Sequence, residues 1–154
     1  MGHTVPTDPL IGTWRLLSYA REVLETGERF NQFGEEPVGY IGYAPDNRMY
    51  AIFTRKDRIS PADAVPTDEE GLQLLGTMVA YAGTFSLDAE KVTHHIDTSW
   101  NQAWTGTDQV RYYSLNDDML SITTAPYKSY YDGRMGKSIL LWQKVKADVD
   151  TPNM

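Results

Sequence analysis

Residues 38–54 read VGYIGYAPDNRMYAIFT, and this stretch decides how the chain is expected to fold. Along residues 48–54, Met49, Ala51 and Phe53 alternate with Tyr50 and Ile52. This alternation has the period of a β-strand with two distinct faces. The four residues at 44–47, APDN, favour a tight turn, because proline presets φ and asparagine tolerates the left-handed conformation. The stretch therefore predicts a β-hairpin with strands at 38–43 and 48–54.

The same alternation recurs along the rest of the 154 residues, interrupted by turn sequences. A chain of this length is expected to form one domain. Strands that run mainly up and down favour an all-β fold, an eight-stranded antiparallel barrel, whose closure removes the sheet edges and can enclose one small ligand. The expected strands are 12–23, 38–43, 48–54, 81–87, 91–99, 109–115, 119–124 and 138–145.

One segment departs from this pattern and predicts a helical insertion at about 67–80. Thr67 and Glu70 have the spacing of a capping box, in which each side chain binds the backbone of the other. Glycines within the segment weaken the helix, so we expect it to depend on packing over the sheet or over one end of the barrel. Its apolar face would consist of Leu72, Leu75 and Val79.

The domain boundaries follow from where the strands begin and end. The barrel is expected over residues 10–146, between flexible tails at 1–9 and 147–154. Residues 127–137 contain two glycines and two adjacent tyrosines and predict a mobile loop before the last strand.

Composition excludes several classes of function. The 14 Lys and Arg residues are outnumbered by 21 Asp and Glu, so the net charge of −7 disfavours nucleic-acid binding. The absence of cysteine excludes disulfides, thiolate chemistry and cysteine metal sites. The sequence shows neither an apolar run long enough for a membrane span nor a signal-type leader, so a cytoplasmic location without membrane partners is expected.

Five short motifs, taken in order and spacing, resemble the bacterial and fungal lipocalin-like domain family. They are LIGTWRL (10–16), GEEPVGY (34–40), YAGTF (81–85), VTHH (92–95) and WTGTDQVR (104–111).

The resemblance covers roughly residues 8–145 and implies a small cytosolic barrel, with some relatives associated with secondary-metabolite pathways. Gly12-Thr13-Trp14 is also similar to the Gly-x-Trp signature of lipocalins, in which the tryptophan closes the floor of the barrel. The glycine-rich heme pattern of nitrobindin-like barrels does not occur, so the resemblance does not imply heme.

His94 and His95 lie in one expected strand and must face opposite sides of it, so they cannot both point into the barrel or bind one metal ion. His94 belongs to the more apolar alternating set and is the inward candidate, as a general base, a hydrogen-bonding group for a ligand or an ordinary core residue. His95 and Asp97 would lie on the solvated face. A bulge that inverted the alternation would instead make them an acid/base pair inside the barrel.

Arg111 is the second candidate for chemistry. The resemblance carries an arginine at this position, and a buried guanidinium could bind a carboxylate or an enolate oxygen. A structural ion pair is the alternative. His94 and Arg111 are thus the candidate catalytic residues.

The 18 aromatic residues predict an apolar cavity with a few hydroxyl groups, suited to a flat ligand with oxygen substituents. Trp100 and Trp104, in the loop between two strands, are candidate lids. A tyrosine-rich outer surface that serves a homodimer is the competing explanation. The candidate ligand-binding residues are Tyr43, Met49, Ala51, Phe53, Tyr81, Phe85, Trp100, Trp104, Tyr113 and Tyr130.

Two functions remain open at this stage. The first is binding of a small apolar, oxygenated metabolite, aromatic or polyketide-like, inside the barrel. The second is a cofactor-free isomerase, cyclase or dehydratase that acts on such a metabolite by proton transfer and by fixing its conformation. Familiar nucleotide, zinc and nucleophile motifs do not occur in the sequence, so neither a cofactor nor a metal is expected.

Overall fold

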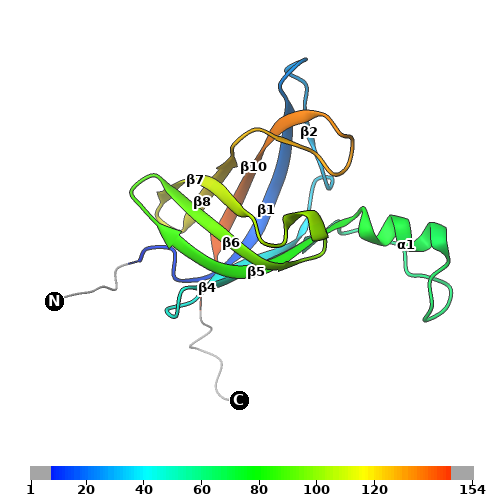
Figure 1. Cartoon of the computed structure of the whole chain (residues 1–154), viewed down its shortest axis with the longest axis horizontal. Coiled ribbons are helices and arrows are strands. Elements are labelled where there is room, and N and C mark those ends of the chain that lie inside the picture. Colours follow the sequence, from blue (N-terminus) through cyan, green and yellow to red (C-terminus); the bar gives the residue numbers. More distant parts are fainter. Residues whose placement is uncertain (1–7, 147–154) are drawn as a thin grey trace.

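The computed structural model describes residues 8–146 as a closed antiparallel barrel (Figure 1). Eight strands follow one another around the barrel in the order β1-β3-β4-β5-β6-β7-β8-β10, and pairing of β1 with β10 closes it. The predicted eight-stranded barrel is therefore confirmed. The elements are β1 (Gly12–Val23), β2 (Arg29–Asn31), β3 (Val38–Tyr43), β4 (Arg48–Thr54), α1 (Asp68–Leu75), β5 (Met78–Leu87), β6 (Lys91–Ser99), the 3-10 helix η1 (Gln102–Trp104), β7 (Asp108–Asn116), β8 (Met119–Thr124), β9 (Tyr127–Lys128) and β10 (Met135–Lys144).

The hairpin predicted from residues 38–54 is formed by β3 and β4. The backbone N–H of Ala44 donates to the carbonyl of Arg48 at 2.9 Å, and Asn47 takes the left-handed conformation with φ of 69°. The turn thus uses asparagine where a positive φ is needed.

Two short strands were not predicted. β2 pairs with the end of β1, and β9 pairs with the start of β10. The segment 127–137, predicted as a loop, is therefore a small hairpin that continues into β10. The tails predicted at 1–9 and 147–154 lie outside the described residues, apart from Asp8 and Pro9.

A bulge in β1 changes which of its side chains face inward. Leu16 pairs with Trp142 of β10, but the next pair is Ser18 with Leu141, so one extra residue interrupts the register. Trp14 and Leu16 are buried before the bulge, and the buried set then shifts to the odd-numbered positions, which include Arg21. The bulge therefore brings an arginine to the inner face.

The helix forms with its predicted cap but does not pack on the barrel. The Glu70 N–H donates to the Thr67 hydroxyl at 3.1 Å, and the Thr67 N–H donates to the Glu70 carboxylate at 2.8 Å. However, α1 ends at Leu75, none of its residues is buried, and it projects away from the barrel (Figure 1). The expected packing was wrong because Val79, counted in the apolar face of the helix, belongs to β5 and is buried inside the barrel.

One end of the barrel is closed by Trp14. Its indole N–H donates to the Leu10 carbonyl at 3.0 Å, and the Lys144 ammonium lies 4.9 Å from the centre of its ring. No helix within residues 8–146 is both long and apolar enough to cross a membrane.

Candidate functional site

The barrel encloses a cavity of about 40 Å³ toward the end opposite Trp14. This volume holds about three water molecules. Much of the wall is apolar, and polar groups reach it from several strands. The residues of its apolar wall are Ile41, Ala51, Phe53, Val79, Ile122 and Leu140.

A chain of three hydrogen-bonded side chains lies beside this cavity. His94 is fully buried, and its Nε2 lies 2.7 Å from the hydroxyl of Tyr43 while its Nδ1 lies 2.9 Å from the hydroxyl of Tyr81. Tyr81 and His94 both line the cavity. Since both ring nitrogens are engaged, His94 can exchange a proton with a ligand only through Tyr81.

The proton on His94 is assigned by hydrogen-bond capacity. A neutral imidazole has one N–H donor and one acceptor nitrogen, so one tyrosine donates to the ring and the other accepts from it. Tyr43 is buried and has no second side-chain partner among residues 8–146, so its hydroxyl hydrogen is satisfied only by donation to Nε2. In this tautomer Nδ1–H donates to Tyr81, whose own hydroxyl hydrogen then has no partner among residues 8–146, in a side chain that lines the cavity.

The electrostatic surroundings keep this imidazole neutral. Burial, and to a smaller degree the charges of Arg111 and His95, hold the pKa of His94 well below its ordinary value. Burial also raises the pKa of Tyr43 well above that of a free phenol. The His94 imidazole and the Tyr43 phenol are therefore uncharged at neutral pH.

Arg111 brings a positive charge to the cavity wall. It is 6% exposed, its guanidinium carbon lies 5.6 Å from the centre of the Trp104 ring, and its one hydrogen bond is a long contact of 3.5 Å to the Val110 carbonyl. No carboxylate within residues 8–146 forms an ion pair with it. The structure thus shows a cavity-lining cation and not the structural ion pair that was the alternative.

Trp142 adds a further donor. It lines the cavity and is 1% exposed, and its indole N–H has no hydrogen-bond partner within the described part of the chain. An unpaired donor of this kind costs free energy unless something fills the position.

The wall also carries hydroxyl groups, and one of them, that of Thr124, belongs to the cross-strand partner of Arg111. The hydroxyls of Tyr127 and Ser138 lie 2.7 Å apart, and the Thr124 hydroxyl accepts from the Ser138 N–H at 2.9 Å. These three side chains line the cavity together with Tyr19.

Of the residues proposed from the sequence, six line the cavity: Ala51, Phe53, Tyr81, Trp104, His94 and Arg111. Three more lie inside the barrel next to this group, namely Tyr43, Met49 and Phe85.

The remaining three candidates lie away from the cavity. Trp100 packs on Trp104 with ring centres 5.2 Å apart, and Tyr130, 43% exposed, packs on Trp100. Tyr113 donates to the Asp88 carbonyl at 3.1 Å.

His95 lies on the outer face, as the alternation indicated. Its Nδ1 is 2.8 Å from the Asp108 carboxylate and its Nε2 is 3.0 Å from the Ser86 hydroxyl, while Asp97 pairs with Arg48. The alternative pairing of His95 with Asp97 inside the barrel does not form. No cluster of three potential metal ligands occurs within the described part of the chain.

Several cavity residues were missed from the sequence, although a signal for some of them existed. Thr124 has the parity of Leu120 and Ile122 in β8, and Ser138 that of Leu140 and Trp142 in β10. Polar residues at inward positions of otherwise apolar alternations are the pattern that could have found them.

A match to a family model agrees with this architecture. A model of the lipocalin-like domain family matches residues 11–145. The chain is also similar to the crystal structure of an uncharacterized protein from Bacteroides eggerthii DSM 20697, with 12% identity, a TM-score of 0.43, and coverage of 88% of this chain and 99% of that one. Among curated proteins, none matches the chain.

Proposed function

The chain belongs to the lipocalin-like domain family, and from this premise we propose that its barrel binds a small, flat, apolar metabolite whose oxygen atoms accept hydrogen bonds. Cavities of this kind are apolar, with a few polar groups that orient the ligand. We further propose a cytoplasmic role in secondary metabolism.

One observation carries the proposal: the cavity wall offers hydrogen-bond donors for which residues 8–146 provide no acceptor, or, for Arg111, only the long contact of 3.5 Å to the Val110 carbonyl. They are the Arg111 guanidinium, the Trp142 indole N–H and, by the assignment above, the Tyr81 hydroxyl. Donors in excess of acceptors favour a ligand with carbonyl, carboxylate or enolate oxygens.

Binding of a small molecule requires the cavity to widen from its volume of about 40 Å³, because known small-molecule sites have volumes of roughly 300 Å³ or more. Trp104 is the side chain best placed to move. It is half-buried, sits in the short helix η1, and contacts the cavity residues through its ring alone, with Tyr81 at 5.6 Å and Tyr127 at 6.2 Å between ring centres.

Two probes of matched shape test the proposal by titration calorimetry: 2-acetonaphthalene, a neutral ketone, and 2-naphthoate, in which a carboxylate oxygen replaces the methyl group. Both should bind, with 2-naphthoate the tighter. In Arg111→Gln the affinity for 2-naphthoate should fall by about 10-fold to 150-fold, the worth of a charged hydrogen bond, and that for the ketone much less.

Arg15→Gln is the matched control, because Arg15 is exposed on the same barrel and bonds only to Gln143. It should leave both affinities unchanged. Failure of the wild-type protein to bind either probe would contradict the proposed function.

The Tyr43–His94–Tyr81 chain favours a second candidate, a cofactor-free isomerase or cyclase. A phenol donor backed by an imidazole, beside a guanidinium, would stabilise the enolate form of a bound ketone and so release its α-hydrogens to solvent. Tyr81 and Arg111 would touch the substrate, and His94 would position and polarise Tyr81.

Deuterium exchange tests this candidate with the same ketone. In D₂O the protein should speed exchange of the methyl hydrogens of 2-acetonaphthalene, followed by proton NMR, and Tyr81→Phe should slow it by about 100-fold or more. His94→Gln should lower the rate while the ketone still binds. If exchange is no faster with the protein than without it, the enzymatic candidate is rejected and only the proposed binding function stands.

A further inference from the structure

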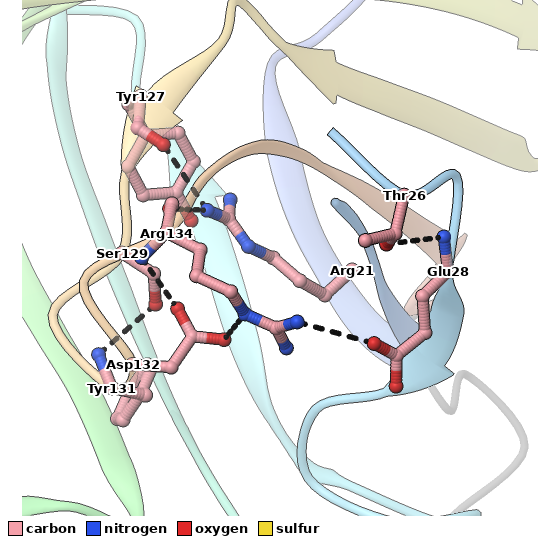
Figure 2. A network of polar contacts seen from close by, with 8 residues as sticks. All are labelled: Arg21, Thr26, Glu28, Tyr127, Ser129, Tyr131, Asp132 and Arg134. Carbon is pink, nitrogen blue, oxygen red and sulfur yellow. Dashed lines mark hydrogen bonds and ion pairs between the residues drawn. The ribbon is translucent and has the colours of Figure 1, made fainter. Parts of the chain in front are cut away.

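Arg21 is a second buried guanidinium, packed on the cavity-lining ring of Tyr127. It is 1% exposed, and its Nη2 donates to the carbonyls of Tyr127 at 3.1 Å and Arg134 at 2.9 Å (Figure 2). Its Nε and Nη1 have no hydrogen-bond partner among residues 8–146. An arginine in a protein stays charged, so its unpaired N–H groups call for an acceptor.

The carboxylates nearest this group are committed elsewhere. Figure 2 shows Arg134 between Asp132, whose carboxylate lies 3.0 Å from its Nε, and Glu28, whose carboxylate lies 3.2 Å from its Nη1. Within residues 8–146, no carboxylate forms an ion pair with Arg21. Within residues 8–146 the Arg21 guanidinium thus directly contacts two carbonyls and an aromatic ring, and Asp132 interacts with its charge without forming an ion pair.

That aromatic ring separates Arg21 from the cavity. The guanidinium carbon lies 4.5 Å from the centre of the Tyr127 ring, and Tyr127 lines the cavity. Gly136 makes room for the arginine, since a Cβ there would lie 3.1 Å from the guanidinium carbon. Displacement of the half-buried Tyr127 side chain would join Arg21 to the cavity.

A row of side-chain contacts connects the two guanidinium groups, with one at each end. Arg21 lies over Tyr127, the rings of Tyr127 and Trp104 meet edge to face at 6.2 Å, and Arg111 lies over Trp104. Flat rings therefore stand between two cations that have no carboxylate partner.

We propose that the natural ligand is a flat dianion, with one carboxylate or enolate end at Arg111 and the other at Arg21, which it reaches by displacing Tyr127. This proposal rests on the proposed function and specifies its ligand class. The two negative charges would neutralise the two buried cations, and the apolar body of the ligand would replace the ring contacts between them.

Three pairs of aromatic acids test the proposal by calorimetry: benzoate with terephthalate, 2-naphthoate with naphthalene-2,6-dicarboxylate, and biphenyl-4-carboxylate with biphenyl-4,4′-dicarboxylate. The diacid of at least one pair should bind the wild-type protein about tenfold or more tightly than its monoacid, well beyond the twofold that two equivalent ends supply. The best pair reports the spacing of the two arginines.

Variants assign that gain to Arg21. In Arg21→Gln the diacid should keep only the statistical factor of about twofold over the monoacid, whose affinity should stay at the wild-type value because it depends on Arg111. Arg15→Gln is again the control and should change neither. Tyr127→Ala leaves Arg21 in place and removes the ring that must move, so it should raise the preference for the diacid even if Arg21→Gln does not fold.

The outcomes separate the two proposals. If a monoacid binds but no diacid gains more than the statistical factor, Arg21 is not a subsite, whereas the proposed function stands. A gain that survives in Arg21→Gln would also overturn this inference. If no probe binds at all, the proposed function itself fails.

Discussion

The position of His94 determines how the stability of the barrel depends on pH. In the folded chain its pKa lies well below the ordinary value, chiefly because of burial. In the unfolded chain the imidazole takes up a proton at about pH 6.5. Between these two values the unfolded state binds more protons, so the free energy of unfolding falls as the pH drops.

We expect this loss to be about 1.4 kcal/mol for each pH unit below about 6.5. Urea unfolding at pH 7.5 and 5.5 measures it, in a range above the titration of the carboxylates. His94→Gln keeps one donor and one acceptor for the two tyrosines and should remove most of this pH dependence, whatever its effect on stability at pH 7.5. The same dependence in both proteins would show that His94 is not held neutral.

Some residues of the site could be predicted from the sequence and others could not, for a physical reason. His94 was placed inward because β6 alternates regularly up to it, and Arg111 was singled out through a family resemblance. Arg21 was not predicted to face inward, because the extra residue after Leu16 reverses the alternation within β1. No side-chain pattern in the sequence marks the position of this bulge.

At the level of elements, the turns and strands were predictable and the helical insertion was not. Turn chemistry at Asn47 and strand alternation are local properties, so the β3–β4 hairpin follows from its own residues. Whether α1 packs on the barrel depends on contacts between distant segments, and its capping box forms equally well in either case.

The insertion between β4 and β5 should therefore be dispensable for folding. Arg55 N–H donates to the Thr77 carbonyl at 3.1 Å, so the two strands already meet at its base. We expect that replacing residues 56–76 by Asn-Gly, which favours a two-residue hairpin, changes the free energy of unfolding by less than about 1 kcal/mol. Urea unfolding measures this, and a loss of several kcal/mol would show that the insertion stabilises the barrel.

Over the whole molecule, the net charge is negative, whereas the two arginines buried inside the barrel are positive. The chain has a net charge of −7, yet Arg21 and Arg111 place two cations inside the barrel with no carboxylate in ion-pair contact. Stability alone does not favour such burial, because a charge removed from water must be compensated. The proposed binding of an oxygen-rich ligand would give these residues a function that compensates this cost.

The two ends of the barrel also differ. At one end the Trp14 indole is bonded to Leu10, and Lys144 donates to the Ile11 carbonyl at 2.9 Å. At the other, rings from the segment between β6 and β7, which contains η1, meet rings from the β9–β10 hairpin by their edges, as in the contact of Trp100 with Tyr130 at 6.0 Å. A ligand should therefore enter between η1 and this hairpin.

Hydrogen exchange followed by mass spectrometry tests the route of entry, with 2-naphthoate as the probe at saturating concentration. Backbone amides in 100–107 and 127–136 should exchange more slowly with the probe bound, because the ligand fills the space beneath these segments and lowers the frequency of their local opening. Amides in 10–14 should be unchanged, since the Trp14 end stays closed whether or not the cavity is filled. In Arg111→Gln the protection should disappear at a probe concentration that still protects Arg15→Gln. Protection confined to residues 10–14 would instead place the entrance at the Trp14 end and contradict entry between η1 and the β9–β10 hairpin.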